Sequence, residues 1–426
     1  MTEPMRRKRK NPILRTRVPL LPPSVRSRVA LGLTAAASLG RFELQVCADC
    51  GMVQYPPREA CYRCLSLTLK WQPQSGDGEL ISETVLHHSH DVYFRERLPW
   101  RLGMIRLDSG PTVIAHLHAA AARAPCRVRI VARLDRAGQA ALVAVPGGDN
   151  VSERVVDMAN DTQLREMTCD PRQRKVLVTD GKNLVGQALA KALSSAGADI
   201  VWVGCAEPWK RPPGLDELER LEAVTLVPLD VTSSESVKSL GAELGAKVDI
   251  LVNTAEVHRT YGIAARYGVD TARLEMDVNY LGLLRLAQEF GPVMRSRGAD
   301  GQSSATAWVN ILSVYALSNF PTHGTYSASK AAAYSLAQCL RAEMQPAGVR
   351  VLNVFPGPID DEWHQELPPP KLTAEALAKA VVKGLQDGIE DLFPGEVAQE
   401  WFARWRENPK VLERELAASR SAGEAT

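Results

Sequence analysis

Short apolar runs alternate with helix-like stretches throughout the C-terminal half of this chain of 426 residues. The apolar runs cover residues 175–179, 200–203, 224–229, 248–253, 307–312 and 349–355. Helical stretches separate them, and the clearest cover residues 185–195, 274–297 and 327–345. Short apolar strands that alternate with helices are typical of a parallel sheet covered by helices on both faces. The pattern therefore predicts an α/β, doubly wound parallel sheet, with a ligand site beyond the carboxyl ends of its strands.

Tyr326 and Lys330 lie four residues apart at the start of the last helical stretch, so both side chains project from one face of the helix. The Lys330 ammonium favours the phenolate and is expected to lower the pKa of Tyr326 towards the working range of a general acid or base. Ser313 follows the fifth apolar run, where its hydroxyl can hold a carbonyl oxygen for Tyr326 to protonate. These three residues predict a site for proton transfer to or from an oxygen atom.

With Asn279 upstream of Ser313, Tyr326 and Lys330, residues 174–426 resemble the short-chain dehydrogenase/reductase family. The resemblance implies a Rossmann-like sheet and an NAD(P)-dependent oxidoreductase. It implies that Asn279 supports a water relay, and that Lys330 assists Tyr326 and holds the nicotinamide ribose. The cofactor-binding positions that it implies are Thr179, Gly181, Lys182, Gly186, Asp230, Val231, Asn253, Ala255, Lys330, Pro356 and Gly357.

Two cofactor motifs depart from the family pattern. Asp180 and Leu184 replace the first two glycines of the Thr-Gly-x-x-x-Gly-x-Gly loop, and Glu256 replaces the glycine of Asn-Asn-Ala-Gly. Two interpretations stay open: a working enzyme with an adapted loop, which the four catalytic residues favour, or a catalytically silent pseudo-reductase that serves as a scaffold. The choice between NAD and NADP is also open, because Gly204-Cys205 at the end of the second run is neither acidic nor basic.

Four cysteines near the N-terminus form two Cys-x-x-Cys pairs with ten residues between them. They are Cys47, Cys50, Cys61 and Cys64. This spacing predicts a closed, tetrahedral structural zinc site. The other four cysteines are scattered, which is typical of a reduced protein and predicts a cytoplasmic location. His87, His88 and His90 are predicted to lie on an ordinary exposed strand and not to bind a metal.

Five strand-like runs follow the cysteines, at residues 78–86, 101–107, 111–117, 127–133 and 140–145. They predict a small β-barrel of the OB type. A helix-prone stretch at 29–42, the Cys-Ala-Asp-Cys-Gly pair and Tyr55-Pro56-Pro57-Arg58 precede the barrel. In this order, residues 29–147 resemble a rubredoxin-like zinc ribbon joined to an acyl-CoA-associated OB fold. The resemblance implies an acyl-CoA-type substrate and docking on a thiolase-like protein partner.

These features predict four segments. They are a basic arm (1–28), a helix with the zinc ribbon and OB domain (29–147), a linker (148–173) and the reductase domain (174–426). No apolar run is long enough for a membrane span. The basic run at 6–10 raises the question of nucleic acid, but a net charge of only +2 and few barrel aromatics argue against it. The reductase family's habit implies a homo-oligomer.

The fusion of these domains suggests one function. Joining an oxidoreductase to a thiolase-docking module raises the local concentration of one product at the next enzyme. The hypothesis is an NAD(P)-dependent enzyme that interconverts a 3-hydroxyacyl-CoA and a 3-ketoacyl-CoA. Residues 359–367 lie where the reductase family places its substrate lid, and Trp363 could cover an acyl group there; an ordinary surface loop explains this segment equally well.

Overall fold

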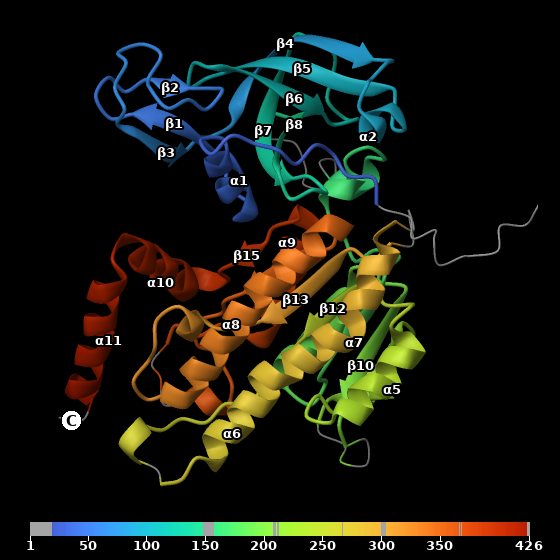
Figure 1. Cartoon of the computed structure of the whole chain (residues 1–426), viewed down its shortest axis with the longest axis vertical. Helices are drawn as coiled ribbons and strands as arrows, with labels where there is room; N and C mark the ends of the chain where they lie inside the picture. Colours follow the sequence, from blue (N-terminus) through green and yellow to red (C-terminus); the bar gives the residue numbers. More distant parts are fainter. Residues whose placement is uncertain are drawn as a thin grey trace, which may run out of the picture.

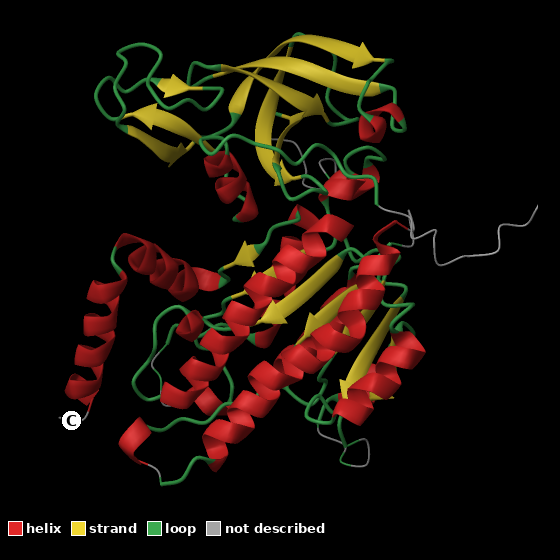
Figure 2. Ribbon diagram, in the orientation of Figure 1, coloured by secondary structure: helices red, strands yellow, loops and turns green. Residues whose placement is uncertain are grey.

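The computed structural model describes residues 19–147, 157–207, 210, 213–265, 267–299, 304–365, 367 and 369–423. Residues 1–18 of the predicted arm and 148–156 of the predicted linker lie outside the described residues, as does the side chain of Trp363. The chain forms two parts, a β-rich N-terminal part and a larger C-terminal part in which helices surround a sheet (Figures 1 and 2). Among the residues that the structure describes, no helix combines the length and apolar character that crossing a bilayer requires.

The N-terminal part begins with one helix and a small antiparallel sheet. The helix is α1 (Leu31–Ser38), and the strands are β1 (Glu43–Cys47), β2 (Val53–Gln54) and β3 (Leu69–Pro73), in the order β2-β1-β3. The predicted helix over 29–42 is therefore too long. It ends early because Gly40 has a φ of 70°, and the amides of Gly40 and Arg41 bond back to Ala37 and Ala36. The chain then reverses directly into β1.

A closed five-stranded barrel follows, as predicted, within the described part of the chain. Its strands are β4 (Asp77–Leu86), β5 (Trp100–Leu107), β6 (Thr112–Leu117), β7 (Cys126–Leu134) and β8 (Ala140–Pro146), in the order β4-β5-β6-β8-β7. Alternate residues of these strands, such as Leu80, Ile105 and Ile130, fill the barrel core. The prediction of a strand at His87, His88 and His90 is wrong, because β4 ends at Leu86 and these exposed histidines lie in the loop beyond it.

The C-terminal part is a parallel sheet of seven strands in the described residues, which confirms the doubly wound prediction. The strands are β9 (Lys175–Val178), β10 (Ile200–Cys205), β11 (Val224–Pro228), β12 (Ile250–Asn253), β13 (Ala307–Ile311), β14 (Arg350–Val354) and β15 (Asp391–Leu392). Their order is β11-β10-β9-β12-β13-β14-β15, so the winding direction reverses between β9 and β12. A crevice for a ligand is expected beyond the carboxyl ends of these two strands.

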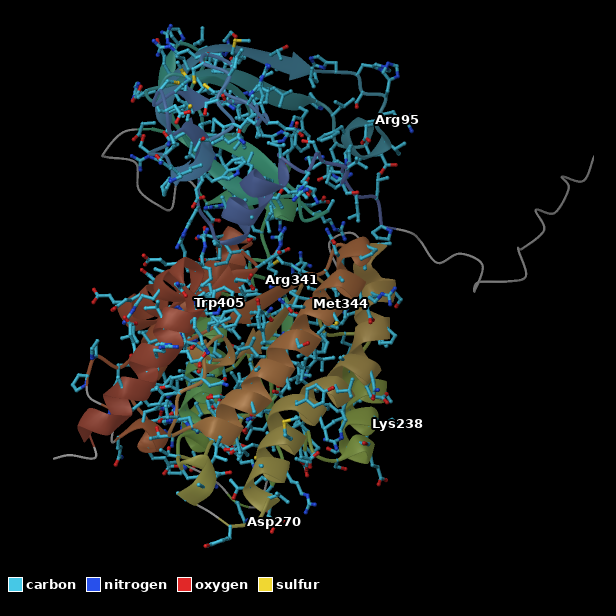
Figure 3. The ribbon with its side chains drawn as sticks, turned by 60° about the vertical axis from the view of Figure 1, so that its left-hand side comes forward. Arg95, Lys238, Asp270, Arg341, Met344 and Trp405 are labelled. Carbon is cyan, nitrogen blue, oxygen red and sulfur yellow. The ribbon has the colours of Figure 1, made fainter. Side chains whose placement is uncertain are left out.

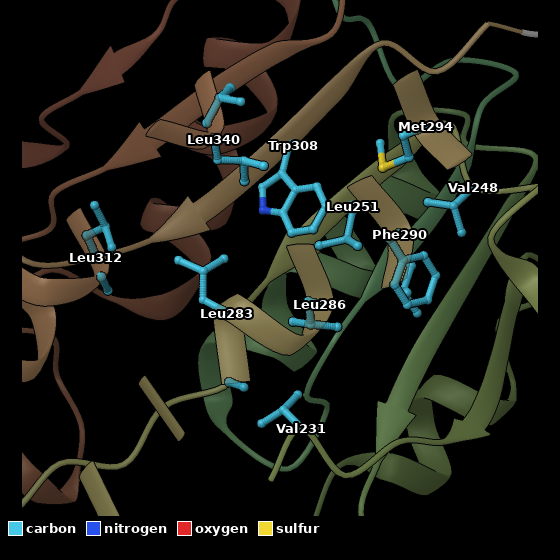
Figure 4. Packing of buried hydrophobic residues seen from close by; sticks show 14 of the residues in the cluster. Val231, Val248, Leu251, Leu283, Leu286, Phe290, Met294, Trp308, Leu312 and Leu340 are labelled. Carbon is cyan, nitrogen blue, oxygen red and sulfur yellow. The ribbon is translucent and has the colours of Figure 1, made fainter. Parts of the chain in front are cut away.

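Helices cover both faces of this sheet (Figure 2), and each face has its own apolar core. One face carries α5 (Ser234–Leu244), α7 (Gly282–Ser296) and α8 (Gly324–Met344); the other carries α3 (Leu184–Ser195), α4 (Leu215–Glu219) and α9 (Ala374–Asp387). Trp308 of β13 is fully buried in the first core, where Leu251, Leu283 and Leu340 surround it (Figure 4). The remaining helices are α2 (Val92–Arg95), α6 (Asp270–Met276), α10 (Gly395–Glu407) and α11 (Pro409–Gly423).

The long helix predicted over 274–297 is interrupted. After α6 the chain forms a π-helical turn at Asp277–Leu281, and only then continues as α7. Asn279, one of the predicted catalytic residues, lies in this turn. Such turns add one residue to a helical repeat and are frequent at functional sites.

Arg350, at the start of β14, joins the two parts of the molecule. Its buried guanidinium donates hydrogen bonds to the carbonyls of Met167, Leu134 and Asp135, at 3.1, 3.0 and 2.9 Å. Figure 3 shows Arg341 and Met344 at the end of α8 that faces the barrel. Part of the predicted linker is also packed here, because Leu164, Met167 and Cys169 are buried. The two parts therefore share an ordered junction.

Candidate functional site

The four predicted catalytic residues converge at the carboxyl ends of the central strands. Ser313 follows β13, Tyr326 and Lys330 lie on the first two turns of α8, and Asn279 lies in the π-helical turn before α7. All four side chains are at most 5% exposed. The structure thus gathers residues that span about fifty positions of the sequence into one buried group.

Hydrogen bonds fix Asn279 and Lys330 at the two ends of this group. The amide of Asn279 donates to the Val257 carbonyl at 2.9 Å and to the Ser329 hydroxyl at 2.8 Å, and its oxygen accepts from the Val257 N–H at 2.9 Å. The Lys330 ammonium donates to the Ile311 carbonyl at 3.0 Å. Asn279 therefore ties the loop after β12 to the helix that carries Tyr326.

Glu256 changes the electrostatics that the sequence predicted. Its carboxylate lies 2.6 Å from the Lys330 ammonium, and the Lys330 side chain is only 2% exposed. The pKa of Tyr326 is raised well above its ordinary value, because the phenol is buried and because the Glu256 carboxylate and Tyr315 lie close to it. The prediction that this pKa is lowered is thus wrong, chiefly because the phenol is buried and secondly because the Glu256 carboxylate lies beside it.

In the loop between β9 and α3, side chains of the loop itself accept hydrogen bonds from its N–H groups. The family pattern expects the cofactor phosphates to accept hydrogen bonds there. The Asp180 carboxylate accepts from the Lys182 N–H at 2.8 Å, and the Asn183 side chain caps α3 by accepting from the Gly186 N–H at 2.7 Å. Leu184, the first residue of α3, is 55% exposed. Free amides at a helix N-terminus are what binds an anion, and two of these amides are already paired.

Five of the predicted cofactor residues line one cavity of about 530 Å³ beside this loop. They are Thr179, Lys182, Asp230, Val231 and Ala255. An adjoining cavity of about 380 Å³ shares Lys182, Asn183, Glu256 and His258 with it and continues towards Ile311. Their joint position at the reversal between β9 and β12 fits the adenine half of a dinucleotide.

The other predicted cofactor residues support the walls of these cavities. Asn253 is buried and accepts a hydrogen bond from the Thr179 hydroxyl at 3.0 Å, which joins the ends of β9 and β12. A Cβ at Gly186 would lie 1.8 Å from the Asp180 carbonyl oxygen, and one at Gly181 would lie 2.3 Å from Val203. Gly181 and Gly186 are therefore required for close packing, whether or not a phosphate binds.

Pro356 and Gly357 lie beyond β14. The Pro356 carbonyl accepts from the Val314 N–H at 3.0 Å, and Gly357 packs against Val397 of α10. The turn thus connects the loop after Ser313 to α10, a helix that the sequence analysis did not predict.

Three buried histidines next to Tyr326 also escaped the sequence analysis. The ring of His258 stacks on that of Tyr326, with centroids 3.9 Å apart, and His323 and His364 pack around it. Burial is the main cause that lowers the pKa of His258 to about 2 and that of His323 to about 4. Because the three residues come from loops far apart in the sequence, no local spacing could have identified them.

Aromatic rings pack behind Tyr326 in the core. Tyr315 lies 6.3 Å from Tyr326 by ring centroids, stacks on Phe320 at 5.4 Å and meets Trp401 of α10 edge-on at 5.6 Å. Because Tyr315 is buried in the apolar core, these rings support Tyr326 from within.

The four cysteines of the N-terminal part fit a zinc ion. The Sγ atoms of Cys47 and Cys64 are 3.6 Å apart, those of Cys50 and Cys61 are 3.7 Å apart, and all four lie within 4.8 Å of one another. Tetrahedral zinc with Zn–S bonds of about 2.3 Å requires separations of about 3.8 Å. The N–H of Cys50 lowers the pKa of Cys47 and the N–H of Cys64 lowers that of Cys61, whereas the pKa values of Cys50 and Cys64 are raised because the four thiols lie so close together.

Comparisons with known proteins divide the chain in the same way. Residues 174–371 match the sequence model of the family described as short chain dehydrogenase. Residues 34–69 match the ChsH2 rubredoxin-like zinc ribbon domain, and residues 71–139 match the ChsH2 C-terminal OB-fold domain.

Individual relatives are similar to the C-terminal part. A short-chain dehydrogenase of Penicillium ochrochloron is 32% identical over 207 residues, which is 46% of this chain and 71% of that protein. An uncharacterized oxidoreductase of Staphylococcus epidermidis is 30% identical over 223 residues, which is 50% of this chain and 91% of that protein. The crystal structure of a short chain dehydrogenase from Burkholderia cenocepacia in complex with NADP is 30% identical with a TM-score of 0.51, and the match covers 58% of this chain and 98% of that one.

Proposed function

The chain belongs to the short-chain dehydrogenase family, and we propose from this premise that it interconverts a 3-hydroxyacyl-CoA and a 3-ketoacyl-CoA while its ribbon and barrel dock on a thiolase-type partner. The observation that carries the proposal is the fusion of this oxidoreductase domain to the two ChsH2-like domains in one chain. NADP is the first cofactor to test, because the Burkholderia cenocepacia structure is a complex with NADP.

The residues around Tyr326 support proton transfer. A bound nicotinamide would supply or accept the hydride. Ser313 would hold the substrate oxygen, and the phenol of Tyr326 would donate its proton to that oxygen during ketone reduction. Because the pKa of Tyr326 is raised, its phenol is neutral near pH 7 and suits the reducing direction. Asn279 donates a hydrogen bond to Ser329, which lies on the same helix as Tyr326, and would support the supply of that proton.

Binding of the nicotinamide ribose by Lys330 requires one rearrangement at the cofactor end. Lys330 is held by Glu256, so this ion pair must open before the ammonium can bind a ribose hydroxyl. Thr179, Asp230 and Val231 line the cavity that suits the adenine half.

Two cavities at the barrel end of the molecule suit parts of an acyl-CoA held for the partner, since they lie at the edge of the sheet opposite Ser313 and Tyr326. One of about 460 Å³ is lined by apolar side chains that include Tyr93, Phe94 and Trp100, which suits an acyl chain. The other, of about 410 Å³ at the junction, is lined by two glutamates and by Arg97, Arg136, Arg165, Arg174 and Arg350. Guanidinium groups are well suited to the phosphates of a CoA group.

A second candidate function follows from the cofactor loop. Asp180, Asn183 and Glu256 already occupy donors that a dinucleotide would need. These contacts favour a pseudo-reductase that holds a thiolase complex together without turnover of its own.

A titration of the full chain with NADPH and NADH, followed by nicotinamide fluorescence, separates the two. Micromolar binding supports the enzyme, and no binding at millimolar concentration supports the scaffold. For the substrate class, reduction of a 3-ketoacyl-CoA is compared with that of the same acyl group on N-acetylcysteamine, which lacks the nucleotide. A fall in kcat/KM of at least tenfold for the short thioester is expected if the chain recognises the nucleotide of CoA, and equal values would contradict the CoA assignment.

A further inference from the structure

His258, His323 and His364 form a compact group of ring nitrogens. Candidate ligand atoms of the three rings lie within 4.8 Å of one another, and the residues are 2%, 1% and 4% exposed. Ring centroids of His258 lie 4.7 Å from His323 and 4.8 Å from His364. Three imidazoles from three loops thus converge on one buried point.

Hydrogen bonds orient two of these rings. Nδ1 of His364 lies 2.7 Å from the Asp361 carboxylate, and Nδ1 of His323 lies 2.8 Å from the Thr322 hydroxyl. Each bond fixes the ring and leaves Nε2 to face the group. A carboxylate or hydroxyl on the second nitrogen is the usual support of a metal-binding histidine.

Three other ring nitrogens of the group lack partners in the described part of the chain. Both ring nitrogens of His258 and Nε2 of His323 are buried without a hydrogen-bond partner in the part of the chain that the structure describes. A buried polar atom without a partner costs about 1–3 kcal/mol, so three of them in one cluster require a cause. One bound ion would satisfy Nε2 of His323 and one of the two nitrogens of His258.

We propose that His258, His323 and His364 bind one divalent transition-metal ion, and that zinc fits the site best. Imidazole is a preferred zinc ligand, and three histidines leave a fourth position for water or substrate. Tetrahedral zinc with Zn–N bonds of about 2.0 Å places its ligand atoms roughly 3.3 Å apart, so the rings must close by about 1.5 Å at most.

Carboxylates lie close to the group and oppose its two neighbouring cations, Lys330 and Arg259. Asp361 contacts His364 directly, and Glu256 neutralises Lys330, the buried ammonium on the Tyr326 side. The stacking of His258 on Tyr326 places the ion beside the proposed proton donor. The metal proposal rests on the histidines alone and holds whether or not the chain reduces a ketone.

The test measures the number of zinc ions bound per chain in the full-length protein after incubation with zinc chloride and desalting. Two zinc ions per chain are expected, one in the cysteine site and one in the histidine site. His364→Asn and, separately, His323→Gln are expected to leave one. His88→Ala serves as the matched control, because His88 and His90 are an exposed pair with ring centroids 5.0 Å apart, and it should retain two.

Cobalt substitution identifies which site is lost. Thiolate-to-cobalt charge-transfer bands report the cysteine site, and weaker bands without thiolate character report the histidine site. The variants should lose only the second signal; the first shows that the ribbon is intact, and an unchanged thermal unfolding transition of the metal-free protein shows that the reductase domain folds. Asp361→Asn should weaken zinc binding at the histidines about 10–100-fold and leave the cysteine site unchanged. One zinc per chain in the unsubstituted protein, or equal zinc in His364→Asn and the unsubstituted protein, would overturn the proposal.

Discussion

The loops of the zinc ribbon and the loops at the cofactor end of the reductase sheet are built in opposite ways. In the ribbon, Cys47 and Cys61 begin two similar turns, and the amides of Gly51 and Leu65 bond back to their carbonyls, so that the thiols point at one shared position. At the cofactor end, Asp180 and Glu256 instead turn towards donors of their own chain. In the ribbon the thiols already face a shared position, so the site can bind an ion without rearrangement. At the cofactor end the side chains are already paired, so these contacts must break before a dinucleotide binds.

The largest expected effect is on the ribbon. Cys47→Ser should abolish zinc binding at the cysteine site and unfold the ribbon, because structural zinc supplies apparent free energies of roughly 10 kcal/mol or more in small domains. Zinc content and thermal unfolding of the full chain measure this. Cys339→Ser, at an exposed free cysteine on α8, should change neither quantity. Full zinc retention in Cys47→Ser would remove the cysteines as ligands.

Tyr326→Phe tests whether the reductase site performs chemistry. Loss of the proton donor should reduce kcat for ketone reduction by about 10²–10⁴-fold, while NADPH binding stays within about threefold. Tyr267→Phe, at a fully exposed tyrosine, is the matched control and should keep its kcat. Equal kcat values for the two variants would exclude Tyr326 as the acid.

Glu256→Gly removes the ion pair between Glu256 and Lys330 at the cofactor end. Release of Lys330 should tighten NADPH binding about 10–100-fold, in line with about 1.5–3 kcal/mol for a hydrogen bond to a charged group. Glu256→Gln keeps the bulk without the charge, so it should recover most of the gain if charge dominates. Weaker binding in both variants would show that Glu256 supports the cofactor.

The same variant predicts a change in pH dependence. The neutral phenol is the proton donor in reduction, so the rate should fall only as pH rises through the raised pKa of Tyr326, above the ordinary value near 10. Removal of the Glu256 carboxylate lowers that pKa and should move the falling limb of kcat to lower pH. An unchanged profile in Glu256→Gly would mean that burial alone sets the pKa.

The smallest effect is expected for Asp180→Gly. This change restores the first glycine of the loop and frees the Lys182 amide, and should improve NADPH affinity by about two- to fivefold, within the 0.5–1.5 kcal/mol of one hydrogen bond. Asp216→Gly, on the surface of α4, controls for helix and charge effects and should leave the affinity unchanged. A loss of affinity in Asp180→Gly would show that the loop needs its Asx turn.

Sequence reasoning predicted features that depend on nearby residues. The run at 307–312 became β13 with one residue of difference, and the two Cys-x-x-Cys pairs meet at one point. The π-helical turn at Asp277–Leu281 was not predicted, because a single added residue leaves helical periodicity almost unchanged. Strand β2 has only two residues, and β1 and β3 were missed because polar residues such as Glu43 and Gln45 stand at buried positions of β1 while β3 is largely exposed.

The site shows the same division. The placement of Tyr326 and Lys330 on one helix face could be predicted, but their electrostatics could not. Glu256 reaches Lys330 from a different loop, and the approach that fixes their 2.6 Å contact depends on the packing of the whole sheet. The histidine group required three loops to be placed in space, which no linear pattern encodes.

Arg350 connects the barrel domain to the strand that leads towards the catalytic residues. It lies at the start of β14, holds three carbonyls of the barrel domain and the connector, and the other end of the same strand leads into Pro356 and the loop of Ser313. A strand is a stiff rod compared with a loop, since its hydrogen bonds to both neighbours resist stretching. If the proposed partner binds the barrel, it would contact the domain whose carbonyls Arg350 holds, and the five residues of β14 run from that contact to the loop beside Ser313.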